Sequence, residues 1–368
     1  MSELPAPLQR ALALARLAVA VSEPNPRVGC VLVARDGGVL GEGHTQVAGG
    51  PHAEVAALRA AQAAGRDVRG ATAYVTLEPC SHHGRTGPCC DALVAAGVAR
   101  VVASVADPNP RVAGQGFERL RAAGVQVEVG PGAEAARELN LGFFSRMVRG
   151  TPWVRLKVAA SLDGRTALED GTSQWITGPA ARADGHAWRA RATAVLTGIG
   201  TVLQDDPRLD VREASTSRQP DLVVVDSRLE TPVSARLFGA ARRIWIYTAQ
   251  PESPRRGELE ALGAEVVAMP GPGGKVDLPA LLRDLARREV NELHVEAGFK
   301  LNGSLVREGL ADEFLVYLAP RLIGVGHGMA GFGPLSSLAD ALPLRWQSVE
   351  PVGDDLRVVA RVAGRDAF

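Results

Sequence analysis

The stretch VTLEPCSHHGRTGPCC, residues 75–90, places three cysteines and two histidines within sixteen positions, directly after an apolar run. Only one other cysteine, Cys30, occurs among the 368 residues. Secreted disulfide scaffolds are short and cysteine-dense, which this chain is not. The spacing therefore favours metal or thiolate chemistry at a point where a strand gives way to a loop and a helix.

Length and composition set the class of protein. A chain of 368 residues predicts two domains, and 46% hydrophobic with 22% charged residues is typical of a soluble globular protein. The apolar runs are too short to cross a bilayer, and charges at amphipathic spacing interrupt the first 21 residues, so we expect a cytoplasmic protein without a membrane partner. A formal net charge of zero disfavours nucleic-acid binding and favours a small-molecule substrate.

The first half alternates between helical and strand patterns, which predicts an α/β layer fold with parallel strands at its centre. RDGG at 35–38 predicts a hairpin turn. Helices are expected at 5–21, 51–65, 89–97, 114–124 and 133–147, and strands at 28–34, 71–77, 100–105 and 125–130.

The second half alternates in the same way after RGTP, residues 149–152, which we interpret as a linker. We expect domains at 1–148 and 149–368. Three strand-like segments follow one another with little helix near the end of the chain, which predicts an antiparallel edge on a mixed sheet. Strands are expected from 153, at 192–200, 221–226, 242–248, 264–269 and 292–298, with helices at 179–191 and 277–288.

His52, Cys80 and Cys89 are the candidate metal ligands, because zinc binds one imidazole and two thiolates and leaves its fourth position to water. Glu54, two residues beyond the histidine, supplies a carboxylate beside that water. This spacing matches the H-x-E…P-C…C signature of zinc nucleobase deaminases, in which hydroxide attacks an amidine carbon and Glu transfers protons. Helix N-termini near His52 and Cys89 favour thiolate.

Other interpretations of these residues compete. In a structural zinc site His82 or Cys90 supplies a fourth protein ligand, and Glu54 then has no role. A disulfide between Cys89 and Cys90 is sterically poor. Cys30 and Cys90 are most simply small buried residues.

Four segments carry a family resemblance: PNPRVGCVLV at 24–33, GEGH at 41–44, GGPHAEVAAL at 49–58 and TLEPC through RVV at 76–102. They resemble the deaminase half of the bifunctional riboflavin-biosynthesis deaminase/reductases, and the second half of the chain resembles the reductase half. The eight residues between the thiols, SHHGRTGP, distinguish this family from cytidine and transfer-RNA deaminases. The resemblance implies a cytidine-deaminase-like α/β/α domain followed by a dihydrofolate-reductase-like α/β domain.

For the deaminase half the resemblance implies a ribosylated pyrimidine 5′-phosphate as substrate. It places His82 and Arg85 near the phosphate or ribose, and Asn25 and His44 near the base or sugar. The alternative for these residues is a solvated loop. Gly87 departs from the second proline of many relatives, which loosens the loop without removing a ligand.

Two features of the second half suggest ligand binding. Lys157, one of only three lysines, lies in an apolar strand, where it must either extend to solvent or meet an anion. In ELHVEAGFKLNGSLV, residues 292–306, a strand ends near Glu296, Gly298 turns the chain and a helix begins, and the amides of such a turn suit phosphate. The G-x-G at 198–200 is weak evidence of a dinucleotide site.

The resemblance implies NADPH as reductant and a hydride transfer to the ribose C1′ of an opened, imine-like substrate, with Asp205 or Lys157 positioning a proton or the opened sugar. Trp175 has a core aromatic as its alternative role, and Glu296 a surface carboxylate. Phe299 and Lys300 depart from the more usual residues of relatives. Implied substrate contacts are Lys157, Ser173, Arg189, Leu209, Arg212 and Glu296; implied cofactor contacts are Ala159, Trp175, Thr201, Asp205, Ser227, Gly298, Phe299, Lys300, Leu301, Asn302, Gly303 and Ser304.

The leading hypothesis is therefore a two-site enzyme: zinc-dependent deamination of a diamino-ribosylamino-pyrimidinone phosphate, then NADPH-dependent reduction of its ribose. One alternative is a zinc deaminase acting on a nucleic-acid base, with the second half as an accessory binding domain. Another is a non-enzymatic scaffold stabilised by zinc. The family resemblance also implies a homo-oligomer.

Overall fold

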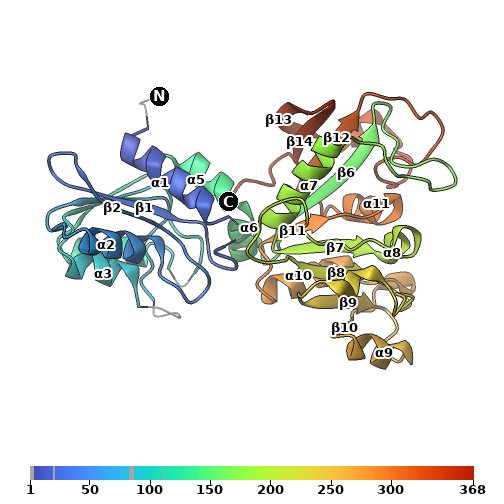
Figure 1. Ribbon diagram of the computed structural model, residues 1–368, viewed down its shortest axis with the longest axis horizontal. Helices are drawn as coiled ribbons and strands as arrows, with labels where there is room; N and C mark the ends of the chain where they lie inside the picture. Colours follow the sequence, from blue (N-terminus) through green and yellow to red (C-terminus); the bar gives the residue numbers. More distant parts are fainter. Residues whose placement is uncertain (1–3, 20, 83–86, 111) are drawn as a thin grey trace. The chain divides into compact units, whose positions relative to one another are not determined.

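The computed structural model describes residues 4–19, 21–82, 87–110 and 112–368. It divides into two compact units, Met1–Gly150 and Thr151–Phe368, each built on its own β-sheet (Figure 1). The division falls inside the RGTP segment. Among the described residues, every helix is too short or too polar to cross a membrane.

The first unit contains a five-stranded sheet in the order β2-β1-β3-β4-β5. β1 pairs antiparallel with β2, across the predicted hairpin, and with β3, whereas β3, β4 and β5 are parallel. The expected α/β fold with parallel strands is thus confirmed. The strands are β1 Gly29–Val33, β2 Val39–His44, β3 Thr72–Val75, β4 Arg100–Ala103 and β5 Gln126–Val129.

Glycines let two helices lie directly on opposite faces of this sheet. A Cβ on Gly29 would lie 1.9 Å from Ala11 O of α1 (Ala6–Leu17), and a Cβ on Gly43 would lie 2.5 Å from Ala53 O of α2 (Ala53–Ala63). Gly43 pairs with Cys30, the neighbour of Gly29, so the two glycines face opposite sides. Helix, sheet and helix therefore form the three expected layers. The unit also contains α3 Cys89–Ala95 and α4 Gln115–Ala122.

The prediction of one helix over 133–147 is wrong. Two helices, α5 Ala133–Leu139 and α6 Leu141–Arg149, meet at Asn140, whose φ of −122° is not helical. The Asn140 side chain explains the break: its Oδ1 accepts from Arg27 N at 2.7 Å and its Nδ2 donates to Arg27 O at 3.0 Å. A distant backbone segment thus holds Asn140 in a conformation that the apolar periodicity does not reveal.

The second unit contains a nine-stranded sheet in the order β10-β9-β8-β7-β11-β6-β12-β14-β13. The seven strands from β10 to β12 are parallel, and β14 is antiparallel to β12 and β13, as expected for an antiparallel edge. The strands are β6 Trp153–Ser161, β7 Ala194–Gly198, β8 Asp221–Val225, β9 Ile244–Thr248, β10 Ala264–Ala268, β11 Glu292–Val295, β12 Glu313–Ala319, β13 Leu344–Val352 and β14 Asp355–Val362.

The carboxyl ends of β6, β7, β8 and β11 meet at one edge of this sheet, because the strands are parallel neighbours. Ligands bind at this edge in open α/β sheets. The expected strand at 192–200 is shorter than predicted, since residues 199–200 already begin a helix. The helices are α7 Pro179–Arg191, α8 Ile199–Asp205, α9 Arg255–Ala261, α10 Leu278–Arg287 and α11 Phe299–Arg307.

Candidate active sites

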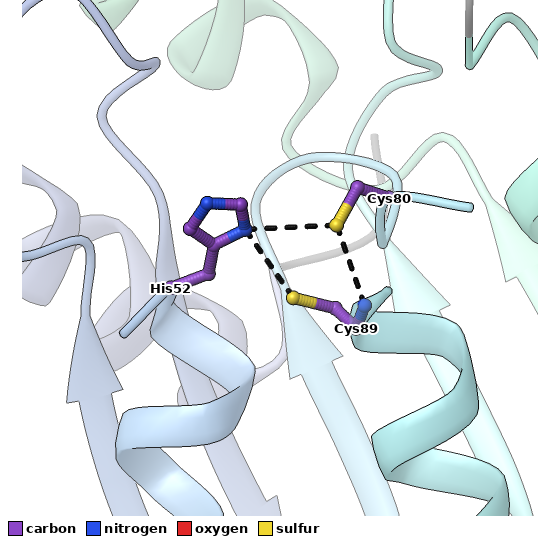
Figure 2. A group of neighbouring side chains, drawn as sticks. All are labelled: His52, Cys80 and Cys89. Carbon is purple, nitrogen blue, oxygen red and sulfur yellow. Dashed lines mark hydrogen bonds between the residues drawn. The ribbon is translucent and has the colours of Figure 1, made fainter. Parts of the chain in front are cut away.

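Three predicted metal ligands come together from different elements of the first unit (Figure 2). His52 immediately precedes α2, Cys80 lies in the loop after β3, and Cys89 is the first residue of α3. His52 Nδ1 lies 3.6 Å from Cys80 Sγ and 3.4 Å from Cys89 Sγ. All three ligand atoms lie within 4.8 Å of one another.

Backbone contacts bring the two cysteines together. Cys89 N donates to Cys80 Sγ at 3.3 Å, and Cys90 N donates to Cys80 O at 3.2 Å. The first turn of α3 therefore closes on the residue that follows β3. Eight residues lie between the two cysteines in the sequence, so their spacing alone does not show that the thiols lie this close together.

The donor set fits zinc. One imidazole and two sulfurs are ligands that zinc prefers, and three protein ligands leave one tetrahedral position open. Hydrogen bonding from Cys89 and His52 lowers the pKa of the Cys80 thiol, and the same bond to Cys80 raises the pKa of Cys89. One sulfur is thus poised as thiolate. Neither His82 nor Cys90 belongs to the group.

The remaining cysteines behave as packing residues. All four thiols are free, so Cys89 and Cys90 form no disulfide. Cys30 and Cys90 are buried, as predicted, and the Cys90 thiol donates to Asp91 Oδ1 at 3.6 Å. Cys90 therefore makes a local contact on α3 and is not directed to the metal group.

Glu54 lies in the first turn of α2, two residues beyond His52, and is only 3% exposed. Burial, and then the charge of Cys80, raises its pKa to about 7. A carboxyl group with such a pKa both accepts and donates a proton near neutrality. It is not among the candidate ligands, so it is available for proton transfer beside them.

Asn25 and His44, two of the other residues expected to contact the deaminase substrate, lie near the end of the sheet at which β3 ends. His44 ends β2 and pairs with Gly29 at the start of β1, four residues after Asn25. Burial lowers the pKa of His44. His82 Nδ1 is buried and has no hydrogen-bond partner among the described residues. Arg85 lies outside the residues that the structure describes.

In the second unit, two cationic residues with implied substrate roles, Arg189 and Lys157, lie beside the carboxylate of a third, Glu296. Arg189 of α7 donates from Nε and Nη2 to Glu296 at 2.6 and 2.9 Å, and Lys157 Nζ lies 4.0 Å away. The charges of Arg189 and Lys157 outweigh burial and hold the pKa of Glu296 well below its usual range. Glu296 is therefore not a surface carboxylate, and Lys157 meets an anion.

Asp210 connects this cluster to Arg212 and Leu209. Its carboxylate pairs with Arg212, and its backbone oxygen accepts from Arg189 Nη1 at 2.5 Å. His186 of α7 accepts from Arg212 N at 3.2 Å. The sequence did not reveal Asp210 or His186, because nothing in their local pattern distinguishes them from ordinary loop and helix residues.

Trp175 is not a core aromatic, because its side chain is 65% exposed, with the Arg182 guanidinium 4.7 Å from the ring centroid. Ser173, nearby in the same loop, is half-buried. Ala159 lies on the same face of β6 as Lys157, since alternate residues of a strand share a face. These residues are placed where a ligand can reach them.

The residues expected to hold the cofactor follow three neighbouring strands. Ser227 follows β8, Thr201 and Asp205 lie in α8 after β7, and Gly298 precedes α11 after β11. A Cβ on Gly298 would meet only Thr201 Oγ1, at 3.8 Å. The other expected residues, Phe299, Lys300, Leu301, Asn302, Gly303 and Ser304, all belong to α11.

Within α11, Asn302 is buried and donates to Ala297 O and Met329 O, each at 3.1 Å, while its Oδ1 has no partner among the described residues. Gly303 packs on the backbone of Gly331. α11 starts at exposed residues after the turn at Gly298, and Asn302 Oδ1 has no partner among the described residues. These features fit a polar cofactor such as NADPH.

The comparisons with known proteins identify both units. Residues 1–105 match the cytidine and deoxycytidylate deaminase zinc-binding region, and residues 152–358 match the RibD C-terminal domain. The riboflavin biosynthesis protein RibD of Escherichia coli is 46% identical, covering 95% of this chain and 96% of its own, and that of Aquifex aeolicus is 40% identical over 95% and 96%.

Solved structures agree. Acinetobacter baumannii RibD has a TM-score of 0.87 at 41% identity, covering 97% of this chain and 98% of its own. A Thermotoga maritima diaminohydroxyphosphoribosylaminopyrimidine deaminase/5-amino-6-(5-phosphoribosylamino)uracil reductase has a TM-score of 0.86 at 32% identity, with the same coverage. The expected fold, zinc-dependent deaminase and NADPH-dependent reductase are thereby confirmed. This chain belongs to the RibD family of bifunctional deaminase/reductases of riboflavin biosynthesis.

Proposed function

We propose that residues 1–148 deaminate 2,5-diamino-6-ribosylamino-4(3H)-pyrimidinone 5′-phosphate and that residues 149–368 reduce the ribosyl group of the resulting 5-amino-6-(5-phosphoribosylamino)uracil to ribityl. The observation that carries the proposal is the group of His52, Cys80 and Cys89 beside a buried carboxyl, Glu54. The name of the Thermotoga maritima relative, a diaminohydroxyphosphoribosylaminopyrimidine deaminase/5-amino-6-(5-phosphoribosylamino)uracil reductase, supports the choice of substrate.

In the first half, His52, Cys80 and Cys89 would hold zinc, which when bound would activate water for attack on the amidine carbon. Glu54 takes up the two protons of that water in turn on its carboxylate and delivers one to the ring nitrogen of the amidine and the other to the departing amino group. The ring carbon keeps the oxygen as a carbonyl, and ammonia leaves. The pKa of Glu54, raised to about 7, suits both halves of this transfer. Asn25, His44, His82 and Arg85 orient the substrate.

In the second half, residues at the carboxyl ends of β7, β8 and β11 bind NADPH, which supplies hydride to C1′ of the opened, imine-like sugar. The pair of Arg189 and Glu296 anchors the substrate side of this edge. Burial lowers the pKa of Lys157 and raises that of Asp205, so each is a candidate carrier of the proton that completes the reduction. The remaining substrate contacts are Ser173, Leu209 and Arg212.

The zero net charge supports a small-molecule substrate over a polynucleotide. On the family resemblance we further propose that the chain self-associates and acts in the cytoplasm. Sedimentation of the purified chain tests the first of these, since a monomer at micromolar concentration contradicts it.

The proposal is tested on the purified full chain by measuring zinc content, ammonia release from the diaminopyrimidine phosphate, and NADPH oxidation when the deaminated product is supplied. We expect one zinc per chain and both activities, with chelation abolishing only ammonia release. Zinc without either turnover would instead support the scaffold. Salt-sensitive polynucleotide binding with ammonia release from polynucleotide would support the nucleic-acid deaminase.

A further inference from the structure

Glu78 is a buried carboxylate, two residues before Cys80, whose oxygens all face backbone amides of one distant segment. Oε2 accepts from Asp107 N at 3.1 Å and from Gly114 N at 3.0 Å. Oε1 accepts from Gly116 N at 2.9 Å and from Phe117 N at 3.4 Å. A single side chain thus holds the backbone of Asp107, Gly114, Gly116 and Phe117 against the chain that follows β3.

This carboxylate takes the place of a helix cap. α4 begins after Gly114, which has no side chain to cap the helix, and the first amides of a helix lack partners within it. Gly116 and Phe117 N–H donate to Glu78, and a negative charge there is also favoured by the helix dipole. The start of α4 is therefore fixed by a residue of the chain that leads to Cys80.

The contact also requires close backbone approach. A Cβ on Gly116 would lie 2.0 Å from Pro79 O, the carbonyl of the residue directly before Cys80. α4 therefore lies against the peptide that carries the metal ligand. α4 therefore blocks rotations of that peptide that would bring Pro79 O closer to Gly116, and so limits the positions that the Cys80 thiol can adopt.

Arg119 of α4 contacts Ser81, the residue that follows Cys80. Arg119 donates to Ser81 O at 3.1 Å and forms an ion pair with Asp91 of α3 at 2.7 Å. α3 begins with Cys89. Through Glu78 and Arg119, α4 thus contacts the residues on both sides of Cys80 and the helix that carries Cys89.

We propose that Glu78 is a positioning residue for the metal centre: by fixing α4 on the end of β3, it sets the direction of the Cys80 thiol relative to Cys89 and His52. The inference rests on the proposed zinc-dependent function of these three residues. Glu78 itself lies outside the candidate ligand group, so it acts through Cys80.

The test compares Glu78→Gln with Glu128→Gln in the full chain. The amide of Gln offers one accepting oxygen, so two of the four backbone N–H groups would face its NH₂ group. Glu128 is a half-exposed carboxylate of β5 that pairs with Arg100, away from the cysteines, so its substitution is the matched control. We measure zinc affinity by competition with a chromogenic chelator, the thiolate-to-cobalt absorption of the cobalt(II) form, and kcat and KM for ammonia release.

For Glu78→Gln we expect about 10- to 100-fold weaker zinc binding or lower kcat, a changed cobalt spectrum and faster amide exchange at 107–117, with NADPH oxidation unchanged. A folded Glu78→Gln protein with wild-type zinc affinity, cobalt spectrum and kcat would overturn the proposal and leave the proposed function intact. Absence of ammonia release in the wild-type chain would instead overturn the proposed function.

If Glu78→Gln does not fold, Arg119→Met takes its place. Arg119 is half-exposed, so its substitution should destabilise the fold less than that of buried Glu78. The substitution removes the contacts of Arg119 to Ser81 O and Asp91. A weakened zinc affinity with a changed cobalt spectrum supports positioning by α4, and wild-type values for both overturn it.

Discussion

Arg189 and Glu296, 107 positions apart in the sequence, form a two-point ion pair at 2.6 and 2.9 Å at the ligand-binding edge of the second sheet. Both side chains are nearly buried. Their charges are therefore poorly screened by solvent, and each depends on the other. The ion pair links α7 to the residue that follows β11. Lys157 Nζ lies 4.0 Å from the same Glu296 carboxylate.

We predict that Glu296→Gln lowers the free energy of unfolding of the second unit by about 3–5 kcal/mol, because Arg189 loses its buried partner. NADPH oxidation falls with it, while ammonia release does not change. All five tryptophans lie in residues 151–368, so their fluorescence during urea unfolding reports this unit alone. Glu230→Gln, at an exposed pair with Arg228, is the control and should change little. An equal effect of both variants would contradict the role of burial.

The wild-type pair also predicts a pH dependence. The folded pKa of Glu296 is depressed, so the stability it contributes is present above the unfolded value near 4.3 and is lost as pH falls below it. Glu296→Gln should therefore unfold with a shallower acid dependence than the wild-type chain. Parallel acid curves for the two proteins would show that the carboxylate is not the group responsible.

We expect a second loss of folding stability at acid pH, caused by His294 on β11. Burial lowers its pKa to about 3, and neither ring nitrogen has a hydrogen-bond partner among the described residues. Because the folded pKa is below the unfolded value near 6.5, stability is lost as pH falls from about 6.5 toward 3, by up to about 1.4 kcal/mol per pH unit. His294→Leu should remove this slope without loss of stability at pH 7. Tryptophan-monitored urea unfolding at pH 7 and pH 5 measures both values, and an unchanged slope contradicts the prediction.

We predict that Cys89→Ser lowers zinc content and abolishes ammonia release, since a thiolate ligand is lost. NADPH oxidation and tryptophan emission should not change, because both belong to the second unit. Cys90→Ala is the matched control, one residue away and outside the candidate ligand group. Loss of zinc from Cys90→Ala, with retention by Cys89→Ser, would reverse the ligand assignment.

Gly43→Ala should separate α2 from β2, because the new Cβ would lie 2.5 Å from Ala53 O and from Ala57 N. We expect a loss of about 1–3 kcal/mol in the stability of the first unit and weaker zinc binding, since α2 carries Glu54 and follows His52. Circular dichroism and chelator competition measure these effects. Gly87→Ala, where an added Cβ meets no described residue within 4 Å, should change neither.

Much of this architecture could be predicted from the sequence, because alternating apolar periods specify strands and helices locally. The metal ligands were also predictable, since H-x-E and P-C…C place imidazole, carboxyl and thiols in a recognisable spacing. The break at Asn140 and the contacts of Glu78 were not. Both depend on hydrogen bonds to backbone amides far along the chain, which leave no pattern in the side chains. His294 gave no signal, because a histidine in a short strand looks like any other strand residue.

The central claim is that Glu54 transfers protons beside a metal held by His52, Cys80 and Cys89. It is tested most directly by Glu54→Gln in the full chain, with zinc content, ammonia release and NADPH oxidation measured on one preparation. We predict wild-type zinc content and NADPH oxidation, with ammonia release reduced by at least about 100-fold. Ammonia release near the wild-type rate from zinc-loaded Glu54→Gln would contradict the account.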